Sequence, residues 1–166
     1  MFTAAVGLSV CAGSAAYATT RHDVPAPRAL DAQASDSMPN AVEDFGYPHA
    51  DQILKDRGIK LIRGDGRLLL TECTDNWNIQ VKSNSPDVGS NFRFCFAASG
   101  NSGFLSLELK DVFIIQTDGN AVRAKMANDS GTTTVDVPKD DYKPVGEGDL
   151  PGGGQKATLV ELRVTG

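Results

Sequence analysis

The chain has little histidine, and this absence removes the commonest hydrolytic chemistry. Its two histidines are His22 and His49, and none follows position 49. Serine and cysteine hydrolases place a histidine base beside the nucleophile. Such a site is therefore excluded from the rest of the chain unless the His49 segment folds back. A structural zinc site is also disfavoured, because it needs four ligands and both histidines lie in or near a linker-like segment.

The sequence also lacks basic runs and long apolar runs. Its net charge is −5 and its pI about 4.9. Nucleic acids and anionic membranes are bound through clustered Lys and Arg, so we expect neither as a partner. The apolar stretch at the start is short for a membrane span and rich in Ala and Gly. With 166 residues, 40% of them hydrophobic, the chain can bury the core of one domain.

Aromatic residues are scarce, at 7% of the chain. A sugar-binding module usually presents flat aromatic surfaces, and few are available here. Trp77, the single tryptophan, alternates with Ile79 and Val81 and is therefore predicted to lie in the core. Tyr142, in the sequence DDYKPVGEG, is the better candidate for an exposed aromatic side chain.

The first 18 residues have the features of a secretory signal peptide. Residues 1–18 carry no charge, are rich in Ala, Gly and Val, and end in Ala16-Tyr17-Ala18. This pattern predicts cleavage after Ala18 and export, although no basic residue precedes the apolar region. A buried helix is one alternative. A lipid anchor at Cys11 is another, disfavoured because the preceding residue, Val10, is not small.

Residues 19–46 are predicted to be a flexible leader or linker, because Pro, Ala, Asp and Ser dominate without an apolar period. A cleavable pro-segment is the alternative. Residues 47–166 then form the folded domain. Two cysteines remain in it, Cys73 and Cys95, and an even pair in an exported chain indicates a disulfide. Two buried free thiols are the alternative.

The domain is predicted to begin with a short helix over 48–57, with Pro48 near its start and Gly58 just past its end. Ile53 and Leu54 would face inward. The runs IKLIR and RLLLTEC then flank Asp65-Gly66, a strong signal for a β-hairpin. This turn also explains the tripeptide Arg63-Gly64-Asp65 by backbone geometry, so we do not interpret the tripeptide as an adhesion signal.

The rest of the domain reads as short strands. Phe92, Phe94 and Phe96 would share one face of a strand, which places Cys95 and its disulfide on the opposite face. About eight or nine strands at this spacing predict an all-β domain, an antiparallel sandwich or a small barrel, with one short N-terminal helix. Besides the two runs above, the strand-like runs are WNIQVKS, FRFCFAA, GFLSLELK, VFIIQT, AVRAKMA, TTTVDV and ATLVELRV.

No constellation of reactive residues stands out, so we expect no catalytic residue, metal or cofactor. The carboxylate pairs Asp140–Asp141 and Glu147–Asp149 are the only candidates for acid–base work, and both lie in loops that read as solvated. Calcium could be considered around Asp118 and Asn120, or around Asn128 and Asp129, but no twelve-residue loop motif supports it.

Several segments resemble a group of small exported proteins of actinobacteria. They are DQILKDRGIKLIRGDGRLLLTEC, FRFCF, GFLSLELKDVFII, KPVGEGDLPGG and ATLVELRV, and they span about residues 51–164. The resemblance implies export and a domain of this extent, with a short helix, a β-rich body and two cysteines. It brings no catalytic residue.

The sequence therefore favours a secreted, non-catalytic binding or accessory module whose partner is another secreted protein. The candidate partner-binding loop is Tyr142, Lys143, Pro144, Glu147 and Asp149. One alternative is an inhibitor of secreted proteases, with the loop between the cysteines or the loop 142–156 as bait. A less favoured alternative is a hydrolase that uses loop carboxylates such as Asp141 and Glu147.

Overall fold

The computed structural model describes residues 46–74, 76–90 and 92–166. The chain divides into two compact units, Met1–Ala41 and Val42–Gly166, and only the second contains described residues. The predictions of a signal peptide (1–18) and of a leader (19–46) fall almost entirely outside this part. No helix in the described part is long and apolar enough to cross a membrane.

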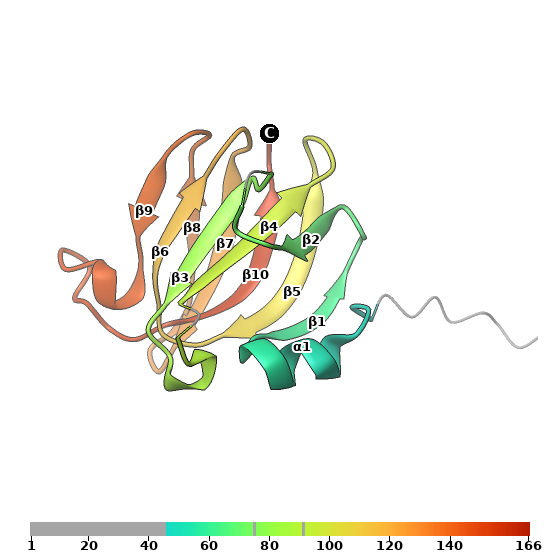
Figure 1. The fold of residues 1–166 in the computed structure, drawn as a ribbon. Helices are drawn as coiled ribbons and strands as arrows, with labels where there is room; N and C mark the ends of the chain where they lie inside the picture. The colour runs from blue at the N-terminus through green and yellow to red at the C-terminus, as the bar shows by residue number, and fades with distance from the viewer. Residues whose placement is uncertain (1–45, 75, 91) are drawn as a thin grey trace, which may run out of the picture. The chain divides into compact units, whose positions relative to one another are not determined.

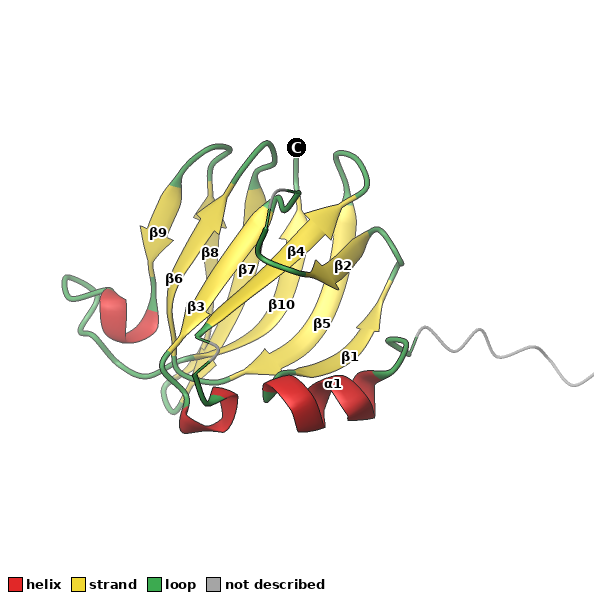
Figure 2. Cartoon of the chain, viewed as in Figure 1, coloured by secondary structure: helices red, strands yellow, loops and turns green. Residues whose placement is uncertain are grey.

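Within the described residues, ten strands form two antiparallel five-stranded sheets; Figures 1 and 2 show how the strands are arranged. Sheet A has the order β1-β5-β10-β7-β8 and sheet B the order β2-β4-β3-β6-β9. The predicted all-β domain with one short N-terminal helix is confirmed, and of the two predicted architectures, sandwich and small barrel, it has the sandwich. The elements are α1 (Ala50–Arg57), β1 (Lys60–Gly64), β2 (Leu68–Thr71), β3 (Ile79–Ser83), η1 (Pro86–Val88), β4 (Arg93–Ala98), β5 (Gly103–Leu109), β6 (Val112–Thr117), β7 (Val122–Asn128), β8 (Gly131–Val137), β9 (Tyr142–Pro144), η2 (Gly146–Gly148) and β10 (Thr158–Val164).

The core lies between the two sheets and follows the alternation of side chains along each strand. In β5, every second residue is a fully buried leucine, and in β7 the buried residues alternate with Arg and Lys. Sheet B contributes the largest buried side chains, Phe94 and Phe96 of β4. Phe92, in contrast, lies before the strand begins and is 48% exposed, so its predicted place in the core is wrong.

The helix α1 begins at Ala50, two residues later than predicted, and ends at Arg57, with Gly58 as its C-cap. Gly58 has a φ of +69°, and its backbone N–H donates to Leu54 O at 2.9 Å. This is the left-handed C-terminal cap that glycine favours. Ile53 packs against the core, as predicted, but Leu54 is 42% exposed. The helix packs against β1, and successive residues of a helix point in different directions, so Leu54 turns away when Ile53 faces the core.

The predicted hairpin at Asp65-Gly66 is wrong, although the tight turn is real. β1 pairs with β5 in sheet A, and β2 pairs with β4 in sheet B. The turn therefore carries the chain from one sheet to the other. The Asp65 carboxylate accepts hydrogen bonds from the backbone N–H of Arg67 at 3.0 Å and of Phe104 at 3.1 Å. An Asp-Gly signal specifies a change of direction, but it does not specify that the flanking strands pair.

We expect Asp65→Ala to lower the free energy of unfolding by about 1 kcal/mol. Two backbone N–H groups lose the carboxylate as their acceptor and must donate to water instead. Urea denaturation measures this change. Asp65→Asn keeps an acceptor oxygen and should recover part of the loss. An unchanged midpoint for Asp65→Ala would show that the carboxylate does not hold this corner.

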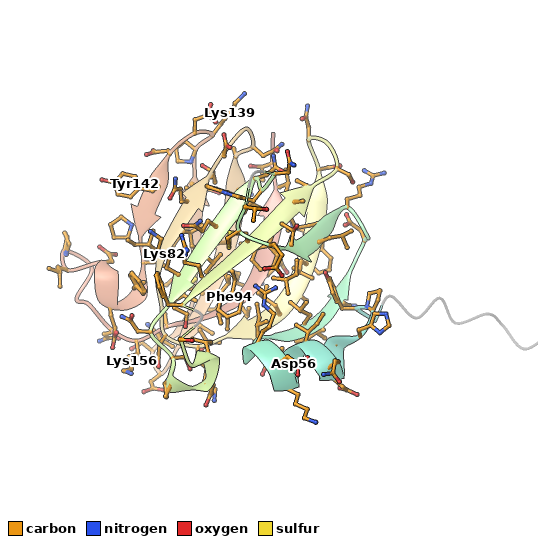
Figure 3. All side chains as sticks on the ribbon, viewed as in Figure 1. Asp56, Lys82, Phe94, Lys139, Tyr142 and Lys156 are labelled. Atoms are coloured by element: carbon orange, nitrogen blue, oxygen red, sulfur yellow. A yellow bond between two sulfur atoms is a disulfide. The ribbon has the colours of Figure 1, made fainter. Side chains whose placement is uncertain are left out.

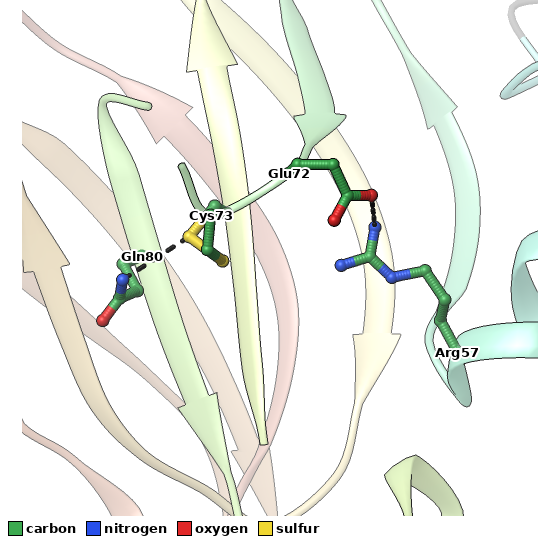
Figure 4. The surroundings of a disulfide bond; sticks show 5 residues. Arg57, Glu72, Cys73 and Gln80 are labelled. Atoms are coloured by element: carbon green, nitrogen blue, oxygen red, sulfur yellow. Dashed lines mark hydrogen bonds and ion pairs between the residues drawn. A yellow bond between two sulfur atoms is a disulfide. The ribbon is translucent and has the colours of Figure 1, made fainter. Parts of the chain in front are cut away.

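Cys73 and Cys95 form the predicted disulfide, which closes a loop with a sequence separation of 22 (Figure 4). Cys95 is fully buried, but unlike its sequence neighbours Phe94 and Phe96 it does not belong to the hydrophobic core cluster. The bridge is therefore on the outer face of sheet B, as the alternation predicted. Gln80 of β3 lies beside it and donates to Cys95 Sγ at 3.5 Å.

Candidate functional site

A groove opens where the two sheets end on the same side. β8 is the last strand of sheet A and β9 the last strand of sheet B, and Figure 1 shows both at the same side of the sandwich. The cavity between them has a volume of about 720 Å³. We call it the edge groove. Its lining includes Met126, Thr133, Val135, Pro144, Val145 and Ala157.

One wall of the edge groove is β8. In the register with β7, Thr133 lies opposite Met126 and Val135 opposite Ala124. Since Met126 and Ala124 belong to the core, Thr133 and Val135 share the inward face. Thr132 and Thr134 alternate with them; all three threonines are exposed, and Thr134 also lines the groove.

The outer edge of β8 is unprotected. The strand pairs with β7 alone, and no other strand adjoins it within the described residues. Proteins usually guard such an edge with Lys, Pro, a bulge or a very short strand. β8 is seven residues long, has no bulge in its pairing with β7, and has no charged residue before Asp136. This edge can accept another strand.

The other wall consists of β9 and the turn that follows it, and both pack against β6. Val145 N–H donates to Phe113 O at 3.0 Å. Gly146 has a φ of +54°, and a Cβ there would overlap the carbonyl oxygen of Val112. A Cβ on Gly148 would overlap the carbonyl oxygen of Phe113. The two glycines let the backbone lie directly on the edge of β6, so this wall is preformed.

The lining of the groove mixes apolar side chains with polar ones, and its charged residues are Asp136, Lys143 and Asp149. At its β8 rim, Arg123 donates two hydrogen bonds to Asp136, at 2.7 and 3.3 Å. This contact lowers the pKa of the Asp136 carboxyl. The Asp149 carboxylate accepts the backbone N–H of Gly152 at 3.1 Å. Lys143 adds one positive charge to the lining, and no ion pair of Lys143 occurs within the described part of the chain.

The five residues of the predicted partner-binding loop separate in the structure. Tyr142, Lys143 and Pro144 are exposed and form β9, a strand that the sequence pattern did not predict. Lys143, Pro144 and Asp149 line the edge groove. Glu147 lies instead beside Lys156, at 3.6 Å. Lys156 also contacts Asp111 at 3.2 Å, and that contact, with a smaller contribution from Glu147, raises the pKa of the Lys156 amine.

The two bait loops of the inhibitor alternative are mostly ordered elements. The segment between the cysteines contains β3 and η1, and the segment 142–156 contains β9 and η2. In the segment 142–156, the turn around Leu150 is exposed, with this side chain 79% exposed. The structure therefore offers a short turn rather than a long extended bait.

A second depression, which we call the aromatic hollow, lies at one end of β3, β6 and β9. It has a volume of about 460 Å³ and is lined by Trp77 and Tyr142 together with Gln116, Asp118, Asp140 and Asp141. Trp77 is half-buried and lies outside the core cluster, so its predicted place in the core is wrong. The strand begins only at Ile79, and the alternation that suggested a core position does not reach Trp77.

The carboxylates of the Asp140–Asp141 pair accept hydrogen bonds from the backbone. Asp140 Oδ1 accepts the Gly119 N–H at 2.6 Å, and Asp141 Oδ1 accepts the Tyr142 N–H at 2.8 Å. At the candidate calcium positions, Asn120 donates to two carbonyl oxygens and Asn128 Oδ1 accepts the Ser130 N–H. Among residues 46–74, 76–90 and 92–166, no group of three or more His, Cys, Asp and Glu could hold a metal ion.

No family model and no curated protein sequence matches the chain. Among solved structures, an antifungal protein from Streptomyces tendae Tu901 is similar, with 17% sequence identity and a TM-score of 0.39. The similarity covers 59% of this chain and 97% of that one. A likeness this distant carries no argument about function, which has to be inferred from the geometry of the edge groove and the aromatic hollow.

Proposed function

We propose that this protein is an exported, non-catalytic module that captures an extended segment of another secreted protein at the free edge of β8. The observation that carries the proposal is a seven-residue edge strand whose one charged residue, Asp136, is paired with Arg123, next to a preformed groove. The disulfide between Cys73 and Cys95 supports export, because such bonds persist mainly in oxidising compartments. The resemblance to small exported actinobacterial proteins supports the same compartment.

Strand addition would use two kinds of contact. An incoming segment pairs its backbone with the outer N–H and C=O groups of β8, which gives affinity without regard to sequence. Its alternate side chains point into the edge groove, since side chains in a strand alternate between faces. Specificity then comes from the fit of every second side chain against the lining.

The lining indicates the chemistry of the partner. The lining combines apolar side chains such as Met126, Val135 and Val145 with polar ones such as Thr133 and Gln155. The partner segment should therefore carry apolar or uncharged polar residues at alternate positions, because an unpaired charge would lose its hydration in the groove. The residues between them face outward and are free to be polar.

We expect the double variant Thr132→Lys, Thr134→Lys to weaken capture of the partner at least about tenfold. Two lysines along the edge reproduce the protection that natural edge strands use, and both positions are exposed, so the fold is unaffected. The matched control is Thr74→Lys, Thr165→Lys, which adds the same charge at two other exposed threonines. Affinity capture from culture supernatant, followed by titration with the purified partner, measures the difference.

Equal capture by both double variants would contradict the proposal. So would a concentration-dependent dimer of the pure protein that only the β8 variant abolishes, since the occupant of the edge would then be a second copy. Light scattering of the pure protein over a wide concentration range distinguishes these cases before any partner is sought.

A further inference from the structure

We propose that the aromatic hollow binds a neutral pyranose sugar of an oligosaccharide chain. This site is separate from the outer edge of β8, although both involve β9. Two aromatic side chains line this one depression. Tyr142 is 61% exposed and points away from β9 in Figure 3. Trp77 is half-buried, so part of it remains accessible.

Exposed aromatic rings favour a ligand with a flat apolar face. Burying such a face against a ring gains hydrophobic free energy, and an aromatic side chain loses little conformational entropy because it has only two side-chain torsions. A pyranose has this shape, with C–H groups on its faces and hydroxyl groups around its rim. The rings of Trp77 and Tyr142 would cover the faces and leave the rim to polar groups.

The polar groups around the rings suit hydroxyls. Asp118 has no hydrogen bond or ion pair to its carboxylate within the described residues, and it is exposed in the lining beside Gln116. A carboxylate accepts hydrogen bonds from hydroxyls, and an amide both donates and accepts. Hydrogen bonds from a hydroxyl to a carboxylate are short and strong. The lining contains no Lys or Arg, so an anionic sugar would be repelled.

The ligand is longer than one ring. A third depression of about 410 Å³ shares Trp77 and Asp118 with the aromatic hollow and continues past Asn76 to Ala97. Trp77 therefore stands between two adjoining depressions whose margins carry amide side chains. This spread of neutral hydrogen-bonding groups fits several hydroxyls in a row. A single organic cation would need only the carboxylates and the rings.

The single tryptophan makes the test direct, because all tryptophan emission of the chain comes from Trp77. The probes are cellohexaose, laminarihexaose, mannohexaose and an N-acetylglucosamine hexamer, titrated to about 10 mM. We expect a saturable change in emission with at least one of them. Tyr142→Ala and Asp118→Ala should each weaken that binding about tenfold or more. Phe92→Ala, which removes an exposed aromatic elsewhere, is the matched control and should bind as the unaltered protein does.

Three results would overturn the proposal. The first is that none of the four sugars produces a saturable emission change and none produces binding heat in calorimetry. Another is unaltered affinity in Tyr142→Ala. The third is an emission change produced by tetramethylammonium chloride at constant ionic strength while the sugars produce none, which would assign the hollow to organic cations. The variant Thr132→Lys, Thr134→Lys should bind the sugar as the unaltered protein does. The sugar test therefore remains valid even if the proposal of partner capture at β8 is contradicted.

Discussion

Removing the disulfide is expected to lower the free energy of unfolding by about 3 kcal/mol. The bond between Cys73 and Cys95 closes a loop with a sequence separation of 22, and breaking it returns that conformational freedom to the unfolded chain. The bond also links the segment after β2 covalently to β4; β2 is a four-residue edge strand that pairs with β4 alone. The measurement is urea denaturation of Cys73→Ala, Cys95→Ala against the oxidised protein.

Reducing the unaltered protein with a thiol is the control, since it breaks the same bond without changing the residues. Both routes should give similar losses. A double variant as stable as the oxidised protein would mean that the covalent link contributes nothing beyond the packing of sheet B.

We expect Gly58→Ala to lower the free energy of unfolding by about 3 kcal/mol, the second large effect. Part of this, about 1–2 kcal/mol, is the cost of a left-handed backbone in a residue with a Cβ. The rest arises because that Cβ would overlap the carbonyl of Asp87, and a backbone atom moves less readily than a side chain. Thermal or urea unfolding measures the loss.

Gly66→Ala is the matched control. Gly66 has a φ of +76°, close to the +69° of Gly58, but nothing lies within 4 Å of a Cβ there. Its substitution should therefore cost only the backbone part. Equal losses at both positions would show that the approach of Asp87 to Gly58 is unimportant.

Local patterns predicted the strands but not their partners. Alternation identified β5 and β7 and placed Cys95 on the outer face of its sheet, because the two-residue period is a property of each strand. The Asp65-Gly66 turn was assigned to a hairpin because nearby strands usually pair. The structure sends β1 and β2 to different sheets, and that choice depends on packing across the core.

The candidate sites were harder to predict for the same reason. β9 has only three residues and includes Pro144, so it carries no alternation long enough to detect. The edge groove exists only because β8 and β9 end their sheets on the same side. Trp77 and Tyr142 are 65 positions apart in the sequence, and only the pairing of β3, β6 and β9 brings them to one hollow.

The central claim is that a partner segment pairs with the free edge of β8. Amide hydrogen exchange of the complex, compared with the free protein, tests it most directly because it reports on backbone N–H groups. We expect slower exchange within 131–137 when the partner is bound, with exchange in α1 unchanged. Unaltered exchange in β8, together with protection elsewhere on the domain, would contradict it.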